Sequence, residues 1–450
     1  MNDAGASPGP PAAAPSGEDA LARLMRGEWR DADTGAAITA PALDVVIAGS
    51  LAGSEAELVA SLALGTRIAV VSDAATDAAM GRRVARALRA LGPVTPLSLG
   101  DDVHADAATV QRLHAATRDV DALVAVGSGT VNDLCKYAAA QQCKPYAVFA
   151  TAPSMNGYTS ANASITFDGH KRSVPAASAR GVFLDLEVLA AAPVRLIRAG
   201  LGDSLCRSTA QVDWLLSHCL LGTPYRTTPF ALLAADEPML LDASAELVAG
   251  DAAAMRALAR TLVLSGIGMT LCGGSHPASQ GEHLISHYID TYAPSSRGAC
   301  PHGEQVGVAT LAMARLQQAM LAGGPPRLRP ARIDPAGLAS RLGDAMATAC
   351  WPDVEAKQAA ASGDTSADRR IAANWDAWRE ALRAASIPVA RLDEALSRAG
   401  AARTPADIGL SAGFFAEAVA NARLLRNRYT FLDLADAAGC LDRIARSASG

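Results

Sequence analysis

The chain has 450 residues, with 40 basic and 45 acidic side chains, a formal net charge of −5 and eight cysteines. Its length allows two or three domains, at about 150 residues for each. The mildly acidic balance and the lack of any lysine and arginine run argue against a nucleic-acid-binding protein. No apolar stretch predicts a membrane span or, ahead of Arg23, a signal peptide. The cysteines are scattered without a CxxC pair, which predicts reduced thiols in a cytoplasmic protein.

The first 190 residues predict a tail followed by an α/β domain. Residues 1–18 are Ala, Pro, Gly and Ser without periodicity, which predicts a disordered tail, and residues 21–29 predict a short helix. From about residue 42, short apolar runs alternate with amphipathic stretches, which predicts a parallel sheet covered by helices on both faces. The expected strands are 43–49, 67–73, 94–100, 122–129 and 146–153, and the expected helices are 81–92 and 105–117. Residues 162–186 predict a β-hairpin that turns at Asp168 and Gly169.

After about residue 187 the strand pattern stops and helical patterns follow. Clear examples are residues 215–222, 246–269 and 414–439, while the polar residues 351–370 predict an exposed helix with a loop. We therefore expect a nucleotide-binding α/β domain over residues 19–190 and a helical domain over residues 191–450.

The glycine-rich residues 127–130 (GSGT) lie between a predicted strand and a predicted helix. Glycine lets a ligand approach the backbone, and a helix N-terminus offers free N–H groups, which together suit a pyrophosphate. The same residues also suit a simple tight turn. Asp73 ends the second strand, where it either accepts the hydroxyl groups of a ribose or caps the next helix. The small polar residues 151–160 suit either a ligand rim or a surface loop.

Four of the eight histidines lie between residues 276 and 302. His283 and His287 are four positions apart, on one face of a predicted helix, and His302 begins another helix. With the carboxylate of Asp203 they predict a metal site of two imidazoles and one carboxylate with an open position. The alternative is a partly buried histidine pair and an ordinary helix cap at Asp203. Gly303, directly after His302, is expected to leave room for a close ligand.

Five motifs occur in a fixed order between about residues 42 and 310: GSGTVND, TAPSMNGYTS, AGLGD, GEHLISH and HGEQVG. Together they resemble the sn-glycerol-1-phosphate dehydrogenase family, within the superfamily of glycerol dehydrogenase, iron-containing alcohol dehydrogenase and dehydroquinate synthase. The resemblance implies a Rossmann-like nucleotide-binding domain, a C-terminal helical metal-binding domain of the dehydroquinate synthase-like type, and a cleft between them.

The resemblance also implies roles for individual residues. Asp203, His283 and His302 would hold one divalent metal, and Asp203 and His287 would act on the substrate. The expected nucleotide contacts, including those argued from the strand ends above, are Asp73, Gly127, Ser128, Gly129, Thr130, Val131, Asn132, Asp133, Thr151, Ala152, Pro153, Ser154 and Ser160.

Two expected substrate residues depart from the family pattern. Asn156 stands where the family commonly has aspartate, so it keeps hydrogen-bonding capacity but loses a charge. Arg207 stands where the family often has lysine, and arginine can still hold a phosphate. Only four lysines occur in the chain, so we expect Lys136 and Lys171 to make specific contacts, whereas Lys357 is attributed to composition.

The sequence thus predicts an enzyme that interconverts dihydroxyacetone phosphate and sn-glycerol 1-phosphate. The expected cofactors are NAD or NADP, with Asp73 favouring NAD, and one divalent ion, with zinc as the default and nickel, iron or cobalt equally suited. His287 or a metal-ordered water would relay the proton. We expect a cytoplasmic homodimer. The alternatives are a dehydrogenase of other polyols or alcohols, a dehydroquinate-synthase-like cyclase, and an inactive nucleotide-binding relative.

Overall fold

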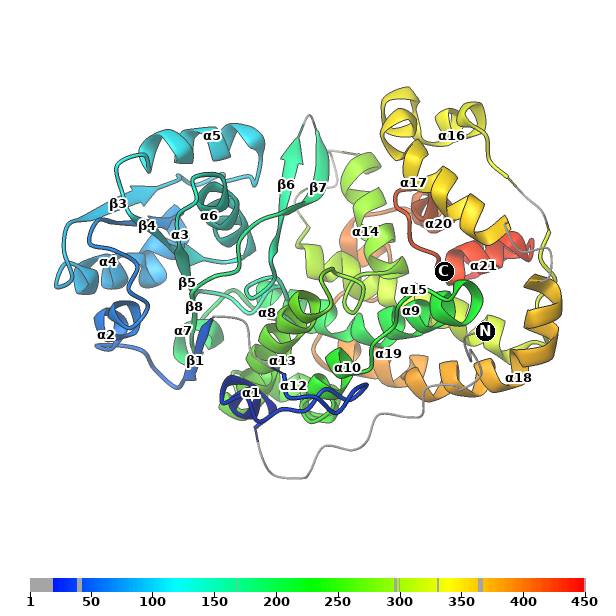
Figure 1. The fold of residues 1–450 in the computed structure, drawn as a ribbon, viewed down its shortest axis with the longest axis horizontal. Coiled ribbons are helices and arrows are strands. Elements are labelled where there is room, and N and C mark those ends of the chain that lie inside the picture. Colours follow the sequence, from blue (N-terminus) through cyan, green and yellow to red (C-terminus); the bar gives the residue numbers. More distant parts are fainter. Residues whose placement is uncertain are drawn as a thin grey trace.

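The computed structural model describes residues 19–38, 43–167, 169–294, 298, 300–329, 332–362 and 367–448. A sheet with helices forms the first half of the chain and helices form the second, and the halves lie side by side in Figure 1. The expected combination of an α/β domain and a helical domain is confirmed. The tail predicted at residues 1–18 lies outside the described residues.

Six parallel strands form the sheet in the order β1-β8-β5-β4-β2-β3. Side chains alternate between its two faces. Ala69 and Val71 belong to one hydrophobic cluster, and Ile68 and Val70 belong to another on the opposite face. The strands are β1 (Asp44–Ala48), β2 (Ile68–Ser72), β3 (Val94–Ser98), β4 (Ala122–Gly127), β5 (Tyr146–Ala150) and β8 (Gly181–Asp185).

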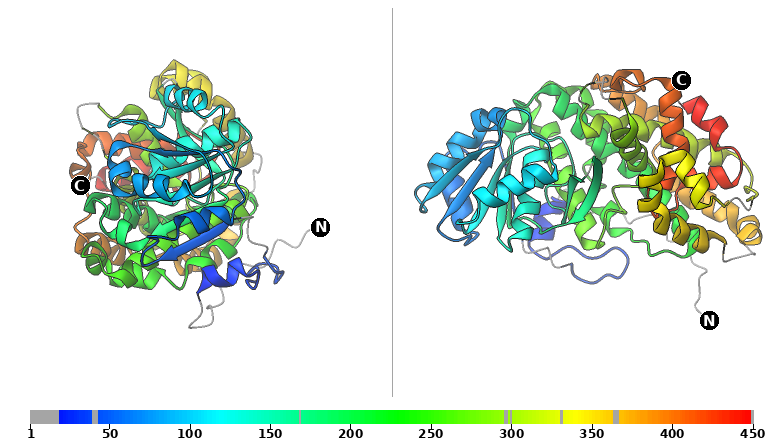
Figure 2. Two further views of the ribbon diagram at one scale, coloured as in Figure 1. Left: turned by 90° about the vertical axis from the view of Figure 1, so that its left-hand side faces the viewer. Right: turned by 90° about the horizontal axis from the view of Figure 1, so that it is seen from above.

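Helices connect these strands and cover both faces of the sheet (Figure 2). Asp106 shows why one of them begins where it does, because its carboxylate accepts a hydrogen bond of 2.7 Å from the backbone N–H of Thr109. The elements are α2 (Glu55–Ala60), α3 (Ala74–Thr76), a π-helical turn (Asp77–Gly81), α4 (Arg82–Leu88), α5 (Ala107–Ala116), α6 (Gly129–Gln141) and α7 (Leu186–Ala190).

The strand order creates a switch point at the carboxyl ends of β2 and β4. These two strands are neighbours, but the chain leaves β2 for the edge strand β3 and leaves β4 for β5 on the other side. Ligands of open α/β sheets bind in the crevice outside such a point. The glycine-rich turn after β4 therefore lies where a nucleotide site is expected.

The predicted hairpin is shorter than its sequence pattern indicated. Only β6 (Asn162–Phe167) and β7 (His170–Pro175) pair antiparallel, and residues 181–185 instead form β8 of the main sheet, between β1 and β5. Gly169 has a φ of 79° at the turn, which glycine adopts without strain, whereas Asp168 lies outside the described residues. The hairpin lies between the two halves of the molecule in Figure 1.

The second half is built from helices packed around the long helices α13 and α15. Its elements are α8 (Val194–Leu205), α9 (Arg207–Leu221), α10 (Thr228–Leu233), α11 (Glu237–Asp242), α12 (Ser244–Val248), α13 (Ala252–Leu271), α14 (Gly281–Tyr292), α15 (His302–Ala322), α16 (Pro335–Leu342), α17 (Asp344–Ser362), α18 (Ala367–Ala385), α19 (Val389–Arg398), a 3₁₀ turn (Ala406–Ile408), α20 (Ala412–Asn421), a second 3₁₀ turn (Ala422–Leu424), α21 (Phe431–Ala437) and α22 (Leu441–Ala448).

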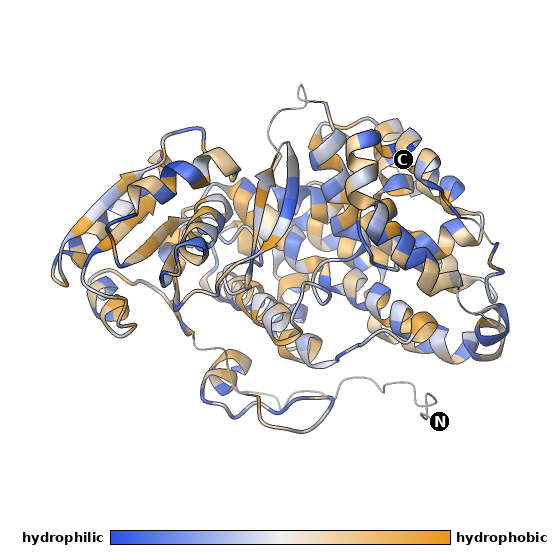
Figure 3. Ribbon diagram, turned by 45° about the horizontal axis from the view of Figure 1, so that its top comes forward, coloured by the Kyte–Doolittle hydropathy of each residue, from blue (hydrophilic) through white to orange (hydrophobic). Residues whose placement is uncertain are grey.

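Two features of this half bear on the predictions. Residues 414–439 are not one helix, because the chain leaves α20, makes a 3₁₀ turn and runs through a loop before α21. Helix α13 is long and apolar enough to span a membrane by length and composition, but 72% of its apolar window is buried inside the protein. Its apolar surface thus packs in the core, and Figure 3 shows hydrophobic and hydrophilic residues alternating along the surrounding helices.

The segment 19–38 precedes the sheet in sequence but packs on the helical half. Its helix α1 (Ala20–Met25) contacts α10, and Asp31 pairs with Arg226. Asp33 accepts hydrogen bonds of 2.9 and 3.0 Å from the backbone N–H of Thr227. The chain therefore begins its described course on the helical half before it enters the sheet.

Candidate functional site

A cavity of about 300 Å3 lies where the glycine-rich turn meets the helical half. Its lining from the α/β half includes residues 128–130 and Asp133, and residues 154–157 with Ser160 from the loop after β5. From the helical half come Asp203 of α8, His283 and His287 of α14, and His302 of α15. The structure thus brings the two groups of predicted residues into one cavity.

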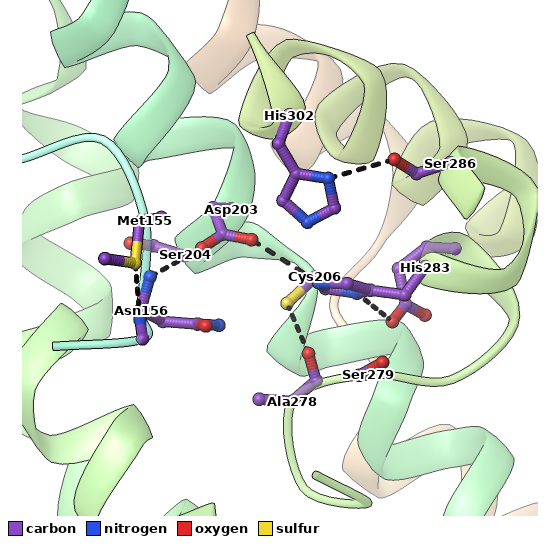
Figure 4. Close-up of polar contacts among 12 residues, drawn as sticks. Met155, Asn156, Asp203, Ser204, Cys206, Ala278, Ser279, His283, Ser286 and His302 are labelled. Carbon is purple, nitrogen blue, oxygen red and sulfur yellow. Dashed lines mark hydrogen bonds and ion pairs between the residues drawn. The ribbon is translucent and has the colours of Figure 1, made fainter. Parts of the chain in front are cut away.

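Asp203 lines this cavity, is buried, and lies between Asn156 and His283 (Figure 4). Its Oδ2 accepts a hydrogen bond of 2.7 Å from the backbone N–H of Asn156, which ties the loop after β5 to α8. Its Oδ1 lies 3.5 Å from Nε2 of His283 and has no hydrogen-bond partner within the described chain. Burial opposes ionisation, but contacts with His283 and His302 keep the pKa of Asp203 below its ordinary value.

His283 is oriented by the residue that precedes it. Nδ1 of His283 lies 2.9 Å from the buried carboxylate of Glu282, so the ring presents Nε2 to Asp203. Glu282 is itself held by the backbone N–H of Gln280 and the hydroxyl of Thr209. Burial alone would lower the pKa of His283, but the Asp203 and Glu282 carboxylates raise it to about 9.

His302 is oriented by a chain of polar groups on the opposite side. Its Nδ1 lies 3.1 Å from the hydroxyl of Ser286, which donates a 3.0 Å hydrogen bond to Gln305. Gln305 in turn donates to Asp290 at 2.9 Å. Burial, reinforced by the nearby charges of Lys171 and His283, lowers the pKa of His302 to about 3. The ring is therefore neutral, as a metal ligand must be.

The donor set of this cluster fits a divalent metal ion. One ligand atom each from Asp203, His283 and His302 lies within 4.8 Å of the other two. The buried Oδ1 of Asp203, which accepts no hydrogen bond from the described residues, is the atom that a cation would satisfy. An adjacent carboxylate on Nδ1, as Glu282 provides for His283, is the usual support of a metal-binding imidazole. Two imidazoles and one carboxylate leave a position open, as catalytic sites require.

His287 lies beside the metal-binding cluster. Its ring centroid is 6.3 Å from that of His283 and 6.0 Å from that of His302. Burial and the positive charge of Arg426 lower the pKa of His287 well below its ordinary value, so the ring is neutral. Nδ1 of His287 is buried without a hydrogen-bond partner in the part of the chain that the structure describes.

The nucleotide end of the cavity is formed by the N-terminus of α6. Ser128 adopts an extended backbone conformation and its side chain makes no capping hydrogen bond to the first-turn N–H groups of the helix. Such an end fits a phosphate group. Gly127 is also required sterically, because a Cβ there would lie 2.5 Å from Cβ of Val131.

Lys136 holds the loop after β5 against α6. Its buried ammonium donates to the carbonyl of Gly157 at 2.6 Å, the hydroxyl of Ser160 at 3.3 Å and the carbonyl of Asn162 at 3.0 Å. Ser160, which we predicted as a nucleotide contact, is thus part of this internal network as well as of the cavity lining.

Several predicted nucleotide residues support the cavity from outside its lining. Val131 is buried in the core, and the side-chain amide of Asn132 donates to Asp133 at 3.0 Å. Thr151 donates its backbone N–H to the carbonyl of Gly127 at 3.1 Å, and the carbonyl of Ala152 accepts from the hydroxyl of Tyr158.

Pro153 packs against α8. A Cβ on Gly200 would lie 1.6 Å from the carbonyl oxygen of Pro153, so only glycine permits this contact.

The structure does not bring Asp73 and Arg207 into the cavity lining. Asp73 caps α3, where its carboxylate accepts from the N–H of Thr76 at 2.7 Å. Arg207 pairs with Glu237 and donates to Gln211, which turns its guanidinium away from Asp203.

The expectation that Gly303 leaves room for a close ligand is wrong. A Cβ there would lie 1.9 Å from the carbonyl oxygen of Ala199, so the space beside this glycine is filled by α8 and not by a ligand.

Sequence reasoning missed the residues that orient the imidazoles. Glu282 and Ser286 lie inside the GEHLISH motif, and Gln305 lies three positions after His302. A buried glutamate directly before a candidate ligand was the available signal for Glu282. Arg426 also lines the cavity, but it is distant in sequence from every motif and carried no signal.

Comparisons with known proteins agree with this geometry. A family model described as iron-containing alcohol dehydrogenase matches residues 46–193. The glycerol-1-phosphate dehydrogenase (NAD(P)+) of Bacillus velezensis is 32% identical over 308 residues, which cover 64% of this chain and 78% of that protein. The same-named protein of Halalkalibacterium halodurans is 34% identical over 259 residues, which cover 55% of this chain and 64% of the relative. The chain thus spans slightly less than two thirds of the latter relative.

Among solved structures, a glycerol dehydrogenase from Schizosaccharomyces pombe superimposes with a TM-score of 0.59 at 16% identity. The superposition covers 90% of each chain. This likeness shows that the two proteins share a fold.

Proposed function

The chain belongs to the glycerol-1-phosphate dehydrogenase family, and on this basis we propose that it is a metal-dependent, NAD(P)-linked dehydrogenase. Its proposed substrates are dihydroxyacetone phosphate and sn-glycerol 1-phosphate. The observation that carries the proposal is the cavity itself, which joins an uncapped helix N-terminus to a cluster of one carboxylate and two imidazoles.

Each end of the cavity supplies one requirement of a reversible ketone reduction. When bound, the divalent ion would polarise the substrate oxygen and the nicotinamide would exchange the hydride. The N-terminus of α6 would hold the nucleotide phosphates and so set the position of the nicotinamide. Asp203, His283 and His302 would hold the metal, and Glu282 and Ser286 would fix the two rings.

His287 is the proposed proton-relay group. Its ring is neutral, and a neutral imidazole has one N–H to donate and one nitrogen to accept. Its ring centroid lies 6.3 Å from that of His283 and 6.0 Å from that of His302, which is close enough for His287 to contact a substrate held at the metal. Asn156 lines the same space, and its side-chain Nδ2 is buried without a hydrogen-bond partner among the described residues.

The test is oxidation of NADH or NADPH, followed by absorbance, with dihydroxyacetone phosphate and with zinc, nickel, iron or cobalt supplied separately. We expect turnover that requires a metal. His283→Ala should lose both bound metal, by elemental analysis, and activity, whereas His104→Ala, on an exposed histidine, should keep both. Absence of turnover with every metal would reject the substrate, and metal retained by His283→Ala would reject the ligand set.

The same assay separates the alternatives. Faster turnover of unphosphorylated polyols would favour a different dehydrogenase, which Asn156 makes reasonable because it replaces a charge with an amide. Release of inorganic phosphate without net NADH change would favour a cyclase. Zinc as the metal, a homodimer and a cytoplasmic location also remain proposals, which elemental analysis, light scattering and cell fractionation would test.

A further inference from the structure

Arg426 lies in the loop between the second 3₁₀ turn and α21, and it lines the cavity beside His287. Its Nη2 lies 3.4 Å from Nε2 of His287. No carboxylate forms an ion pair with Arg426 in the described part of the chain, although Asp353 acts on it at longer range. Burial lowers the pKa of Arg426, yet arginine stays charged at neutral pH. The cavity therefore contains a largely buried cation without a paired anion.

Two neighbouring arginines differ from Arg426, because each has an oxygen acceptor among the described residues. Arg428, two residues later, donates to the carbonyl of Ser279 and, at 2.7 Å, to the hydroxyl of Ser275. Arg423, three residues earlier, pairs with Asp436 at 2.8 Å. These two guanidinium groups have internal partners, so they hold the loop in place. Arg426 presents its donors to the cavity instead.

A second cationic side chain lines the same cavity as Arg426. Lys171 of β7 lines the cavity and pairs with Asp290 at 3.1 Å. Figure 3 shows that one strand of the hairpin is largely hydrophilic. Burial is the main cause of the lowered pKa of His287, and the charges of Arg426 and Lys171 add to it, so both cations act on that ring.

The two metal-binding imidazoles, His287 and Arg426 follow one another along the cavity. His287 lies about 6 Å from the rings of the two metal-binding imidazoles, and Arg426 contacts His287. A small molecule with its reacting oxygen at Asp203, His283 and His302 would place a substituent a few atoms away beside Arg426. Because the group there faces an unpaired guanidinium, an anionic substituent is favoured over a neutral one.

We propose that Arg426, with Lys171 in the same cavity, forms the subsite for the phosphoryl group of the substrate and selects phosphorylated over free trioses. The identity of the anion as a triose phosphate rests on the function proposed above. The existence of an anion subsite at Arg426 does not rest on that function. It follows from a guanidinium that lines the cavity without an ion-pair partner among the described residues.

Binding of inorganic phosphate tests the subsite without any turnover. The wild-type protein, Arg426→Gln, Arg426→Lys and the exposed-surface control Arg315→Gln would be titrated with phosphate by calorimetry, with circular dichroism to check folding. We expect affinity to fall roughly 10- to 100-fold in Arg426→Gln, because hydrogen bonds to charged groups are the strong ones. The fall should be smaller in Arg426→Lys and absent in Arg315→Gln. Equal affinity in wild type and folded Arg426→Gln would overturn the subsite.

Steady-state kinetics then identify the anion. Arg426→Gln should lower the ratio of kcat/KM for dihydroxyacetone phosphate to kcat/KM for dihydroxyacetone roughly 10- to 100-fold, since any effect through His287 is common to both substrates. An equal fall with both substrates would overturn the selective role. A fall confined to NADPH, with NADH unaffected, would assign the anion to the 2′-phosphate of the cofactor and also overturn it. If wild-type protein turns over neither substrate, the proposed function fails, while the phosphate titration still decides the subsite.

Discussion

Three buried polar atoms without hydrogen-bond partners in the described chain belong to residues that line the cavity. They are Oδ1 of Asp203, Nδ2 of Asn156 and Nδ1 of His287. An unpaired buried polar atom costs about 1–3 kcal/mol, so a folded protein rarely keeps several of them together without a ligand to satisfy them. At the scale of the residue, the cavity is thus incomplete by itself.

The charge balance of the metal cluster predicts that metal binding releases a proton. Because Asp203 and Glu282 raise the pKa of His283 to about 9, its ring is protonated in the metal-free protein at pH 7.5. A metal ion binds only the neutral ring, so about one proton should be released per ion, and metal affinity should rise about tenfold per pH unit up to about pH 9. Calorimetry in buffers of different ionisation enthalpy measures the proton count.

Two results check this prediction. Glu282→Gln removes one of the carboxylates that raise the pKa of His283, so it should release fewer protons at the same pH. In the metal-free protein, the raised pKa also stabilises the fold below about pH 6.5, and that contribution is lost as the pH rises towards 9. A wild-type protein that binds metal at pH 7.5 without proton release would contradict the assignment.

The four lysines all make specific contacts in the structure. Lys136 and Lys171 do so as expected, and Lys144 donates to the backbone carbonyls of Thr117 and Arg118. Lys357, which we attributed to composition, is buried and pairs with Asp433 at 2.8 Å, so that interpretation was wrong.

Lys136→Met should destabilise the protein by roughly 2–4 kcal/mol, because two carbonyls and a hydroxyl lose the donor that the buried Lys136 shares among them. Denaturant unfolding of the variant measures the loss. Lys144→Met, at a more exposed position, is the matched control and should lose less. Equal losses in the two variants would show that the network around Lys136 contributes nothing particular.

At the scale of the element, the close approach of α8 and α15 positions two of the proposed metal ligands. Gly202 of α8 and Gly303 of α15 face each other, since a Cβ on Gly202 would lie 2.3 Å from the carbonyl oxygen of Gly303. Asp203 and His302 are their immediate neighbours in sequence. The helix spacing that glycine allows therefore determines whether the carboxylate and the imidazole can share one ion.

Gly303→Ala should separate the two helices and weaken metal binding. The added methyl group would lie 1.9 Å from the carbonyl oxygen of Ala199, and overpacking of this kind costs about 1–3 kcal/mol or more. Thermal unfolding and elemental analysis would show a lower Tm and less bound metal. The control is Gly413→Ala on α20, where nothing lies within 4 Å of the added Cβ. Full metal content in Gly303→Ala would show that the spacing is not critical.

At the scale of the whole molecule, the cavity depends on segments that hold the two halves together. The hairpin is one of them, since the N–H of Thr166 bonds to Ala105 ahead of α5 while Lys171 pairs with Asp290 of α14. The segment 19–38 is another, because it leads into β1 yet is anchored on the helical half through Asp31 and Arg226.

Arg226→Ala should loosen the segment 19–38 without changing the cavity. Asp31 is buried and would lose its counter-ion, at a cost of roughly 2 kcal/mol. Limited proteolysis should then cut the chain near residues 19–38 sooner than in the wild type. Arg82→Ala, which removes an exposed ion pair with Asp77, should change the unfolding free energy by less than about 0.5 kcal/mol. Unchanged proteolysis of Arg226→Ala would show that other contacts hold the segment.

The sequence by itself determined the class of fold, and its motifs predicted the three residues that the structure brings together as a candidate metal cluster. Apolar runs of strand length, alternating with amphipathic helices, predict a parallel sheet from local patterns alone. Asp203, His283 and His302 were identified because their motifs are contiguous. The pattern could not decide whether residues 181–185 belong to the hairpin or the sheet, because a short apolar run suits both and only pairing with β1 and β5 distinguishes them.

The tertiary structure decided which side chains face the cavity and which are occupied elsewhere. Arg207 follows Asp203 closely in sequence but is drawn away by Glu237, whereas Arg426 is more than a hundred residues from His302 and lines the same space. Asp73 caps α3, and the absence of a side chain at Gly303 lets α8 pack closely against α15. The cap at Asp73 is a local contact that the sequence offered as an alternative, but the outcomes for Arg207, Arg426 and Gly303 depend on partners distant in the chain, and a linear pattern contains no record of which distant groups will be buried together.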